Sequence, residues 1–235
     1  MNGKQERRQR LIKLVSAATF LAVVGVAVAV VISLNQSSGG DASNISDAGL
    51  VNDQLRGIPQ KGMVLGDSSA KQALVEFGDL QCPVCKQYAE QVIPEIISGP
   101  VRRGEAKLDF RNYVIIGPES TDAGAAALAA GRQGRGWNFV ELFYRNQGFE
   151  NSGYVDDEFL TAIARGAGVP DIAQWNADRK RRAVLREVSR TSDQASNLGF
   201  TGTPSFAVQG PSGALNPIGT PGSASELESA LSQSD

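Results

Sequence analysis

The amino-acid sequence predicts an α/β domain with a helical insertion, preceded by one N-terminal transmembrane helix. Three observations lead to this prediction. An uncharged apolar run covers residues 14–34 and follows a basic start. Strand and helix patterns alternate before residue 117 and again after residue 200. The segment between them, about 119–198, carries helical patterns only.

Composition and charge narrow the class of protein. The 235 residues are 41% hydrophobic, which suffices for a domain with its own core. Five Lys and Arg against one Glu give residues 1–13 a net charge of +4, so the rest of the chain carries −6. An acidic body argues against a nucleic-acid partner. The chain has no histidine, which excludes a Ser–His–Asp hydrolase.

The apolar run 14–34 is long enough to cross a bilayer, which takes about 20 helical residues. The basic residues 1–13 are then cytoplasmic, and everything after the run is extracytoplasmic. A cleaved signal peptide is the alternative, but its apolar region is normally about 7–15 residues and ends at an A-x-A-like site. No such site follows here, so we expect an uncleaved anchor in the cell membrane. Either reading places the domain where disulfides persist.

Residues 35–54 are rich in Ser, Gly, Asn and Asp, and they are predicted to form a flexible linker. The domain then covers 55–235. Its first half is predicted to hold an extended segment at 58–66, a strand at 73–77, a helix that Pro94 breaks near 91–92, and a strand at 107–116.

The second half begins with helical patterns at 121–132, 137–145, 156–167 and 171–198. A loop and short strand follow at 201–210. Residues 215–218 are predicted to pair with that strand at the sheet edge, because Pro217 cannot donate to a neighbour. A closing helix covers 223–231 and starts with a capping-box pattern.

Both cysteines, Cys82 and Cys85, stand between the strand at 73–77 and the helix after it. This order puts the Cys82 sulfur at a helix N-terminus, where unpaired N–H groups and the helix dipole favour a thiolate. Pro83 suits the first helical turn because its missing N–H has no partner there. We therefore expect Cys82 to be the nucleophile and Cys85 the resolving thiol, with Pro83 and Val84 forming the active-site turn.

Other uses of the cysteine pair are less favoured. A zinc site needs about four ligands, and the chain offers two cysteines and no histidine, so no metal or other cofactor is expected. A purely structural disulfide between Cys82 and Cys85 would close a very small loop and add little stability. A chain with only these two cysteines, in a disulfide-permissive compartment, favours redox chemistry.

Several short motifs occur in a specific order around this pair. They are Gly57-Ile58-Pro59-Gln60, Val75-Glu76-Phe77, Cys82-Pro83-Val84-Cys85, Arg132-Gln133-Gly134 and Gly202-Thr203-Pro204-Ser205-Phe206. Through them, residues 55–232 resemble the DsbA-like thiol–disulfide oxidoreductases of the thioredoxin fold. The resemblance implies a helical domain inserted into that fold and a cis peptide bond before Pro204. It also implies that Thr203 and Pro204 bind the substrate chain beside Cys82.

Glu76 lies on the strand before the cysteines. Strand alternation places it on the same face as Leu74, opposite Val75 and Phe77. Related thioredoxin-like proteins carry an acid at this position, and we interpret Glu76 as a buried carboxyl that exchanges a proton with Cys85. A solvated strand residue is the alternative.

The resemblance implies an enzyme that oxidises cysteine pairs in exported proteins, acts as a monomer and is reoxidised by a quinone-linked membrane oxidase. One departure leaves the direction of electron flow open: strongly oxidising members have a histidine between the cysteines, and here the dipeptide is Pro83-Val84. A reductase or isomerase with the same residues is the first alternative. A non-catalytic tethered binding module with a structural disulfide is the second.

Overall fold

The computed structural model describes residues 45–233. The predicted cytoplasmic segment 1–13 and transmembrane helix 14–34 lie outside this range. Within residues 45–233, no helix combines the length and apolar character that a membrane crossing requires.

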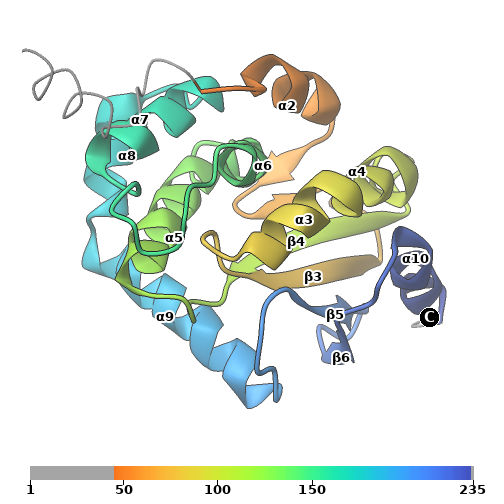
Figure 1. Ribbon diagram of the computed structural model, residues 1–235. Helices are drawn as coiled ribbons and strands as arrows, with labels where there is room; N and C mark the ends of the chain where they lie inside the picture. Colours follow the sequence, from red (N-terminus) through yellow and green to blue (C-terminus); the bar gives the residue numbers. More distant parts are fainter. Residues whose placement is uncertain (1–44, 234–235) are drawn as a thin grey trace, which may run out of the picture. The chain divides into compact units, whose positions relative to one another are not determined.

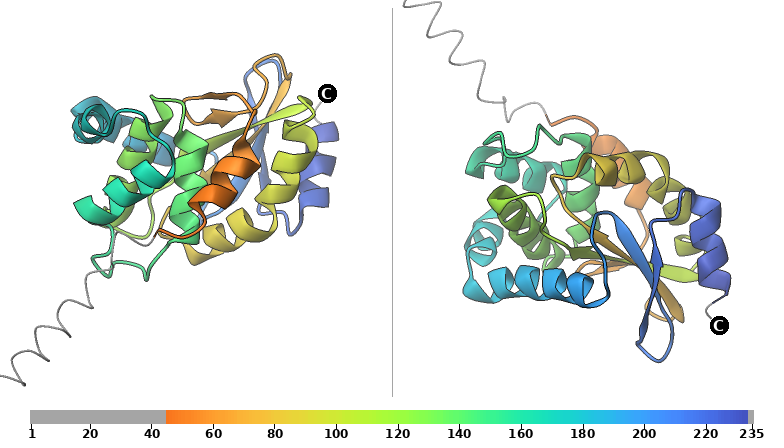
Figure 2. Two further views of the ribbon diagram at one scale, coloured as in Figure 1. Left: turned by 90° about the horizontal axis from the view of Figure 1, so that it is seen from above. Right: turned by 60° about the horizontal axis from the view of Figure 1, so that its bottom comes forward.

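A six-stranded sheet forms the centre, with the strand order β1-β2-β4-β3-β5-β6. The strands are β1 (Gln60–Lys61), β2 (Val64–Leu65), β3 (Gln72–Gly78), β4 (Ala106–Asn112), β5 (Ser205–Gln209) and β6 (Leu215–Gly219). β3 and β4 run parallel, and every other neighbouring pair is antiparallel. The predicted edge strand with Pro217 is β6, at the opposite end of the sheet from β1 (Figures 1 and 2).

Helices cover both faces of the sheet. On one face, Leu74 belongs to the large core cluster, which includes residues of α3 (Pro83–Gln91), α4 (Ile93–Ile96) and α10 (Ala224–Ser232). On the other face, Val75 and Phe77 pack with residues from the end of α9 (Arg182–Asn197) and the loop after it. All residues of β3 are buried, because this strand has neighbours on both sides and cover on both faces.

The predicted break at Pro94 is found. α3 ends at Gln91, and α4 begins at Ile93 with Pro94 in its first turn. A π-helical turn, η1 (Ile97–Val101), follows and leads into β4. The closing helix α10 is also found, with the Ser223 side chain accepting a hydrogen bond from the Glu226 N–H at its start.

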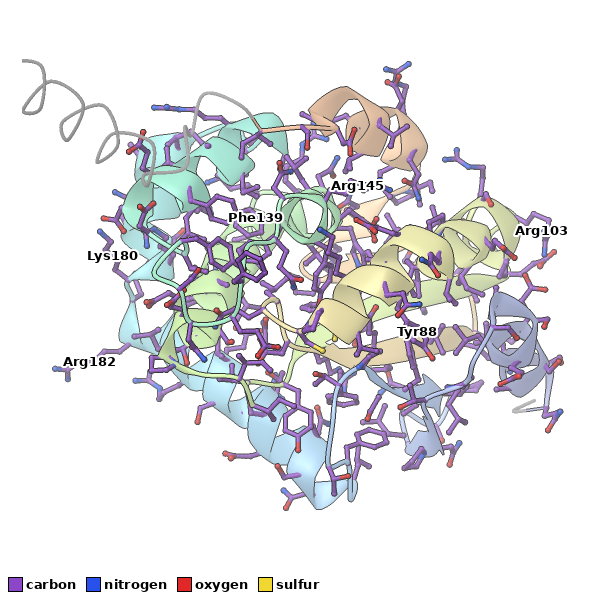
Figure 3. The ribbon with its side chains drawn as sticks, in the orientation of Figure 1. Tyr88, Arg103, Phe139, Arg145, Lys180 and Arg182 are labelled. Atoms are coloured by element: carbon purple, nitrogen blue, oxygen red, sulfur yellow. The ribbon has the colours of Figure 1, made fainter. Side chains whose placement is uncertain are left out.

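The inserted helices are α5 (Pro118–Gly131), α6 (Gly136–Arg145), α7 (Asp157–Gly166), α8 (Ile172–Arg179) and α9. The interior between α6 and its neighbours is aromatic: the Phe139 ring lies 6.2 Å from the rings of Phe143 and Trp175 (Figure 3). This insertion confirms the predicted fold class of a thioredoxin-like sheet with added helices.

The single helical pattern predicted for 171–198 is two helices. Arg181 between them has an extended backbone, and its guanidinium donates to Asp178 Oδ1 at 2.9 Å. At this break Arg182 projects away from the domain, whereas the Lys180 ammonium lies 3.2 Å from Asp157 Oδ2 at the start of α7 (Figure 3).

The predicted linker 35–54 is wrong for its last part, because residues Ala48–Leu55 form helix α2. Val51 and Leu55 are buried, and Asn52 donates to the Gly166 carbonyl at 2.9 Å. Burial of these two apolar residues outweighs the polar composition of the segment. The earlier part, 35–44, lies outside the described residues.

The predicted strand 107–116 is also shorter. It ends at Asn112 because the next N–H groups find other partners: Val114 donates to the Ser192 hydroxyl, while Ile115 and Ile116 donate to Asp79 Oδ2 at 2.9 Å. This turn brings the end of β4 to the residues that precede Cys82.

Candidate active site

Cys82 is the N-cap residue of α3, at the end of the turn that follows β3. Its sulfur accepts a hydrogen bond from the Cys85 N–H at 3.4 Å, and its own N–H donates to the Asp79 carbonyl at 2.9 Å. Pro83 occupies the first helical position, as expected. The helix N-terminus therefore points its free N–H groups at the sulfur.

These contacts lower the pKa of Cys82 to about 6. The largest cause is the hydrogen bond from the Cys85 thiol, with further contributions from Thr203 and from the N–H groups of Cys85 and Val84; burial opposes them. The Cys82 side chain is 5% exposed, and the neighbouring Val84 is 45% exposed. The low pKa makes Cys82 largely a thiolate at neutral pH, although the residue itself is buried.

Cys85 has the opposite character. It is fully buried, and burial raises its pKa well above the usual value, with the neighbouring Cys82 adding to the effect. Both cysteines are free thiols in this structure. One turn of helix thus carries a reactive thiolate and, beneath it, a thiol that keeps its proton.

The loop before β5 lies beside Cys82. The Thr203–Pro204 peptide bond is cis, as the resemblance implied. In its protonated form, the Cys82 thiol donates to the Thr203 carbonyl at 3.4 Å. The Thr203 hydroxyl is buried and has no hydrogen-bond partner among the described residues. The structure therefore brings the predicted residues Thr203 and Pro204 together with the cysteine pair.

Glu76 is 1% exposed, so the alternative of a solvated strand residue is wrong. Its Oε1 atom is enclosed without a hydrogen-bond partner in the described part of the chain. The pKa of Glu76 is raised to about 8, mainly by burial and in addition by the charges of Glu141 and Cys82. The charge of Glu76 also raises the pKa of Cys85, and both side chains are buried.

Sequence reasoning assigned no role to the residues that hold the active-site turn. Asp79 accepts hydrogen bonds from the N–H groups of Gln81, Ile115 and Ile116, each at 2.9 Å. Tyr144 of α6 donates to the Asp79 carbonyl at 3.2 Å. The sequence did contain a signal for Asp79, because it is an acid that directly follows a buried strand and precedes Cys82 by three residues.

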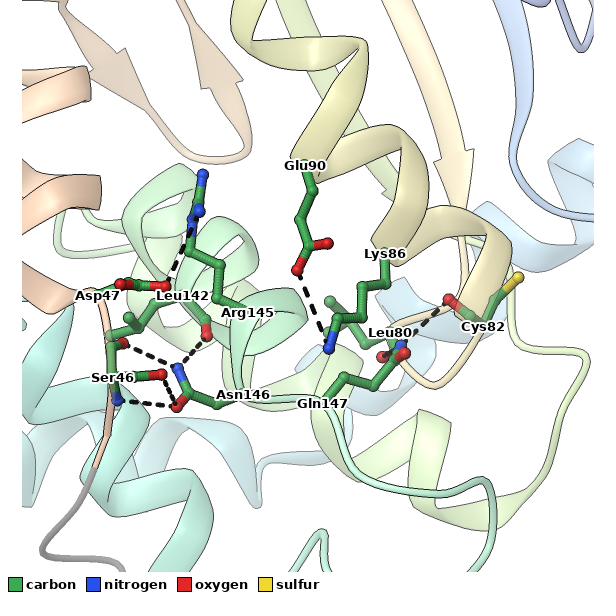
Figure 4. A network of polar contacts seen from close by, with 10 residues as sticks. All are labelled: Ser46, Asp47, Leu80, Cys82, Lys86, Glu90, Leu142, Arg145, Asn146 and Gln147. Atoms are coloured by element: carbon green, nitrogen blue, oxygen red, sulfur yellow. Dashed lines mark hydrogen bonds and ion pairs between the residues drawn. The ribbon is translucent and has the colours of Figure 1, made fainter.

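Gln147 lies just after α6 and reaches the turn from the inserted helices. Its side-chain amide donates to the Leu80 carbonyl at 2.7 Å and to the Cys82 carbonyl at 3.1 Å (Figure 4). Its neighbour Asn146 bonds to Ser46 on the segment that precedes α2. The end of α6 thus connects the start of the described chain with the carbonyl of the nucleophile.

Comparisons with known proteins agree with this site. The family model described as thioredoxin matches residues 59–227. A probable disulfide bond formation protein D from Bacillus cereus is 31% identical over 150 residues, which cover 62% of this chain and 69% of that protein. A disulfide bond formation protein D from Bacillus subtilis is 28% identical over 163 residues, covering 67% and 72%.

Solved structures show the same fold. Oxidised BdbD from Bacillus subtilis superposes with a TM-score of 0.64 at 21% identity, covering 75% of this chain and 96% of that one. A thioredoxin-like oxidoreductase from Silicibacter pomeroyi gives a TM-score of 0.57 at 31% identity, covering 80% and 96%.

A thioredoxin fold with inserted helices and a C-x-x-C pair of unequal thiols defines a thiol–disulfide oxidoreductase. The chain belongs to the thioredoxin family and, within it, to the DsbA-like oxidoreductases. The disulfide chemistry of these relatives argues against the alternative of a non-catalytic binding module.

Proposed function

We propose that this oxidoreductase is a membrane-tethered, extracytoplasmic enzyme that oxidises cysteine pairs in exported proteins. The observation that carries the proposal is the opposite protonation of the two thiols. Cys82 has a pKa of about 6, whereas the buried Cys85 keeps its proton. A stabilised thiolate favours the reduced form of the enzyme and so makes its disulfide an oxidant.

The reaction takes two exchange steps from the oxidised enzyme. A substrate thiolate attacks the Cys82 sulfur, and the electron pair of the Cys82–Cys85 bond leaves on Cys85. A second substrate thiolate then attacks the substrate sulfur of the mixed disulfide, and that electron pair leaves on Cys82. The substrate loses two electrons and becomes a disulfide, while the enzyme becomes the dithiol.

Each leaving sulfur has its own support. Cys82 leaves readily as a thiolate because the helix N-terminus stabilises it. The Cys85 thiolate is buried and needs a proton, and protonated Glu76 faces it. The Thr203 carbonyl accepts a hydrogen bond only from a protonated Cys82 thiol, so in the disulfide and in the mixed disulfide it is free to accept an N–H from the substrate chain, beside Pro204.

The sequence outside the described residues supports the proposed membrane location, and the resemblance to the DsbA-like family supports the proposed partner. The apolar run 14–34 would hold the domain at the outer face of the cell membrane. A quinone-linked membrane oxidase would then take two electrons from the Cys82–Cys85 dithiol and restore the disulfide. The enzyme would act as a monomer.

A reductase is the second candidate, and the active-site dipeptide favours it. Pro83 and Val84 place no positive charge beside Cys82. A pKa of about 6 for Cys82 lies between values of about 7 for thioredoxin and about 3.5 for DsbA. The direction of electron flow therefore depends on a modest difference between the reduction potential of the Cys82–Cys85 pair and that of its redox partners.

Trapping tests the reaction class. The full chain with Cys85→Ser, expressed in a membrane-containing host, should accumulate disulfide-linked adducts with exported proteins, because Cys82 remains reactive and no resolving thiol follows. Cys82→Ser is the matched control and should trap none. A Cys85→Ser protein without adducts under oxidising conditions would contradict the proposal.

The direction of electron flow is tested by the reduction potential of the pair in glutathione buffers. A value near or above about −180 mV supports the oxidase, and one at about −250 mV or lower supports the reductase.

A further inference from the structure

The inserted helix α6 carries a second buried acid, Glu141, that the reaction above does not use. Glu141 is 1% exposed, and both of its carboxyl oxygens are enclosed without a hydrogen-bond partner among the residues of the structure. Asp79 shows the contrast, since three backbone N–H groups hold its carboxylate. An ionised carboxyl without such partners is costly in the interior, so Glu141 is built to hold a proton.

The sheet places Glu76 beneath the face of α6 that carries Glu141. Glu76 pairs with Phe110 of β4, and the Phe110 ring packs against Trp137 and Tyr144, one turn before and one turn after Glu141.

The charged groups that act on Glu141 are Arg145, on the next turn of α6, and Glu90 of α3. Arg145 also has another acidic neighbour: its Nη1 lies 4.0 Å from Asp47 Oδ2, while its Nε is buried without a hydrogen bond (Figure 4). The Arg145 guanidinium therefore neutralises Glu141 only in part.

Glu90 is turned outward from α3, and its carboxylate lies 3.9 Å from the Lys86 ammonium (Figure 4). It adds negative charge near Glu141 from the surface side. Glu76 and Glu141 are consequently two enclosed acids, and among the described residues Arg145 is the cation that acts on Glu141.

Two acids in this position ionise one after the other. The pKa of Glu141 is raised to about 8, mainly by burial. Arg145 opposes this rise, and Glu90 adds to it. The charge of Glu141 in turn raises the pKa of Glu76. When either carboxyl loses its proton, the other holds its own more tightly, and the pair titrates in two coupled steps.

We propose that Glu141 is a positioning residue for the redox pair: by its own protonation it decides whether Glu76 faces Cys85 as a carboxylic acid or as a carboxylate. The inference rests on the proposed roles of Cys82, Cys85 and Glu76, and it deepens them. Neutral Glu141 allows Glu76 to ionise and to accept the Cys85 proton. Ionised Glu141 keeps Glu76 protonated, ready to return a proton to Cys85.

The proton transfer balances without any further reactant. When Cys85 attacks a mixed disulfide on Cys82, the Cys85 proton passes to the Glu76 carboxylate, the new S–S bond forms, and the outer thiolate leaves with the electron pair. In the oxidising direction Glu76 gives that proton back to the Cys85 thiolate. Glu141 changes how readily Glu76 does either and takes no part in bond formation.

The test follows the reduced full-length protein with an aromatic disulfide, dithiobis(nitrobenzoic acid), from pH 5 to 10. Cys82 releases the first thionitrobenzoate in a fast phase. The attack of Cys85 on the mixed disulfide releases the second, and its rate against pH reports the ionisation of Glu76. In the wild-type protein this rate should rise with a midpoint near the Glu76 pKa of about 8.

Glu141→Gln removes the charge and keeps the shape. The midpoint of the second phase should then fall by about one pH unit, which makes that phase about fivefold faster at pH 7. Glu141→Met, which removes the buried polar group, should give the same shift. Glu158→Gln, at an exposed acid of α7, is the control and should keep the wild-type midpoint. In a Glu76→Gln background, Glu141→Gln should no longer move the profile.

A structural role alone would scale the rate at every pH and leave the midpoint in place; that result would overturn the inference. If neither variant folds, carboxyl NMR of wild-type protein with ¹³C-labelled glutamate decides instead, since two carboxyls must titrate above pH 6. A protein that never releases the second thionitrobenzoate contradicts the proposed function. One that releases it with identical profiles in wild type and Glu141→Gln contradicts the Glu141 inference alone.

Discussion

Replacing Val84 by histidine should make the enzyme a stronger oxidant. Val84 stands two residues after Cys82 in the first turn of α3, and its side chain is 45% exposed, so an imidazole fits without repacking the core. A protonated imidazole next to the Cys82 sulfur adds the cation that the Pro83-Val84 dipeptide lacks. An opposite charge at this range lowers a pKa by about 1 to 3 pH units.

The size of the effect can be worked out from the Cys82 pKa of about 6. The lower end of that range applies, because a cation at a helix N-terminus is itself disfavoured. While the Cys82 pKa lies below the pH of the experiment, each further unit by which it falls stabilises the reduced enzyme by about 1.4 kcal/mol, or about 30 mV for a two-electron couple. Solvent screening at this exposed position reduces the gain, so Val84→His should raise the potential by about 20 to 30 mV.

The assay is equilibration of the purified protein with glutathione buffers at pH 7, with the reduced fraction measured by thiol alkylation. Val84→Gln is the matched control, because it adds a polar side chain without a charge. An equal rise in both variants would show that polarity or packing, and not the cation, acts on Cys82. A folded Val84→His protein with an unchanged potential would refute the electrostatic reasoning itself.

Three further changes have definite outcomes. Gln147→Ala removes hydrogen bonds to the carbonyls of Leu80 and Cys82, worth about 1 kcal/mol each, so it should lower the unfolding free energy by about 2 kcal/mol and speed amide exchange in the active-site turn. Thr203→Val removes a buried hydroxyl that has no other hydrogen-bond partner among the described residues and so can donate to the Cys82 thiolate; the thiolate absorbance of the reduced protein should therefore titrate at higher pH. Glu76→Gln removes an acid whose pKa is raised on folding from 4.5 to about 8; its stabilising contribution is present below pH 4.5 and is lost as the pH rises through 8. The variant should therefore lose less stability than wild type between pH 5 and pH 9, as measured by urea unfolding.

The chemistry of Cys82 was predictable because it is local. The strand before it, Pro83 after it and the helix that follows lie within a few residues of one another, so the helix N-terminus had to form at the sulfur. Strand alternation placed Glu76 on the face of Leu74, and the resemblance to thioredoxin-like proteins implied that it is buried. These predictions needed no knowledge of how the rest of the chain folds.

The contributions of the inserted helices were not predictable in the same way. Gln147 reaches the Cys82 carbonyl across 65 positions of sequence, and no local pattern encodes such a contact. The sequence contained only a weak signal for Glu141: it stands among the apolar residues of an amphipathic helix, where an acid is unusual. Helix α2 was missed because Ser, Gly and Asp dominate the composition around two well-spaced apolar residues, Val51 and Leu55.

The thiolate form of Cys82 should make the reduced protein increasingly more stable than the oxidised one as the pH rises. Folding lowers the pKa of Cys82 from 9.0 to about 6, so its stabilising contribution is complete above pH 9 and is lost as the pH falls through 6. The upper limit over this window is about 4 kcal/mol, because each unit of pKa lowering corresponds to about 1.4 kcal/mol.

Cys85 acts outside that window, because its raised pKa costs stability only above pH 9. Glu76 and Glu141 are present in both redox forms, so much of their contribution cancels in the difference. Urea unfolding of the reduced and oxidised proteins at pH 6, 7, 8 and 9 measures that difference directly. A difference that grows with pH means that folding itself drives the disulfide toward reduction, which is the property an oxidase needs. A stability difference that does not change with pH would mean that the Cys82 thiolate does not stabilise the folded protein. That result would favour the reductase.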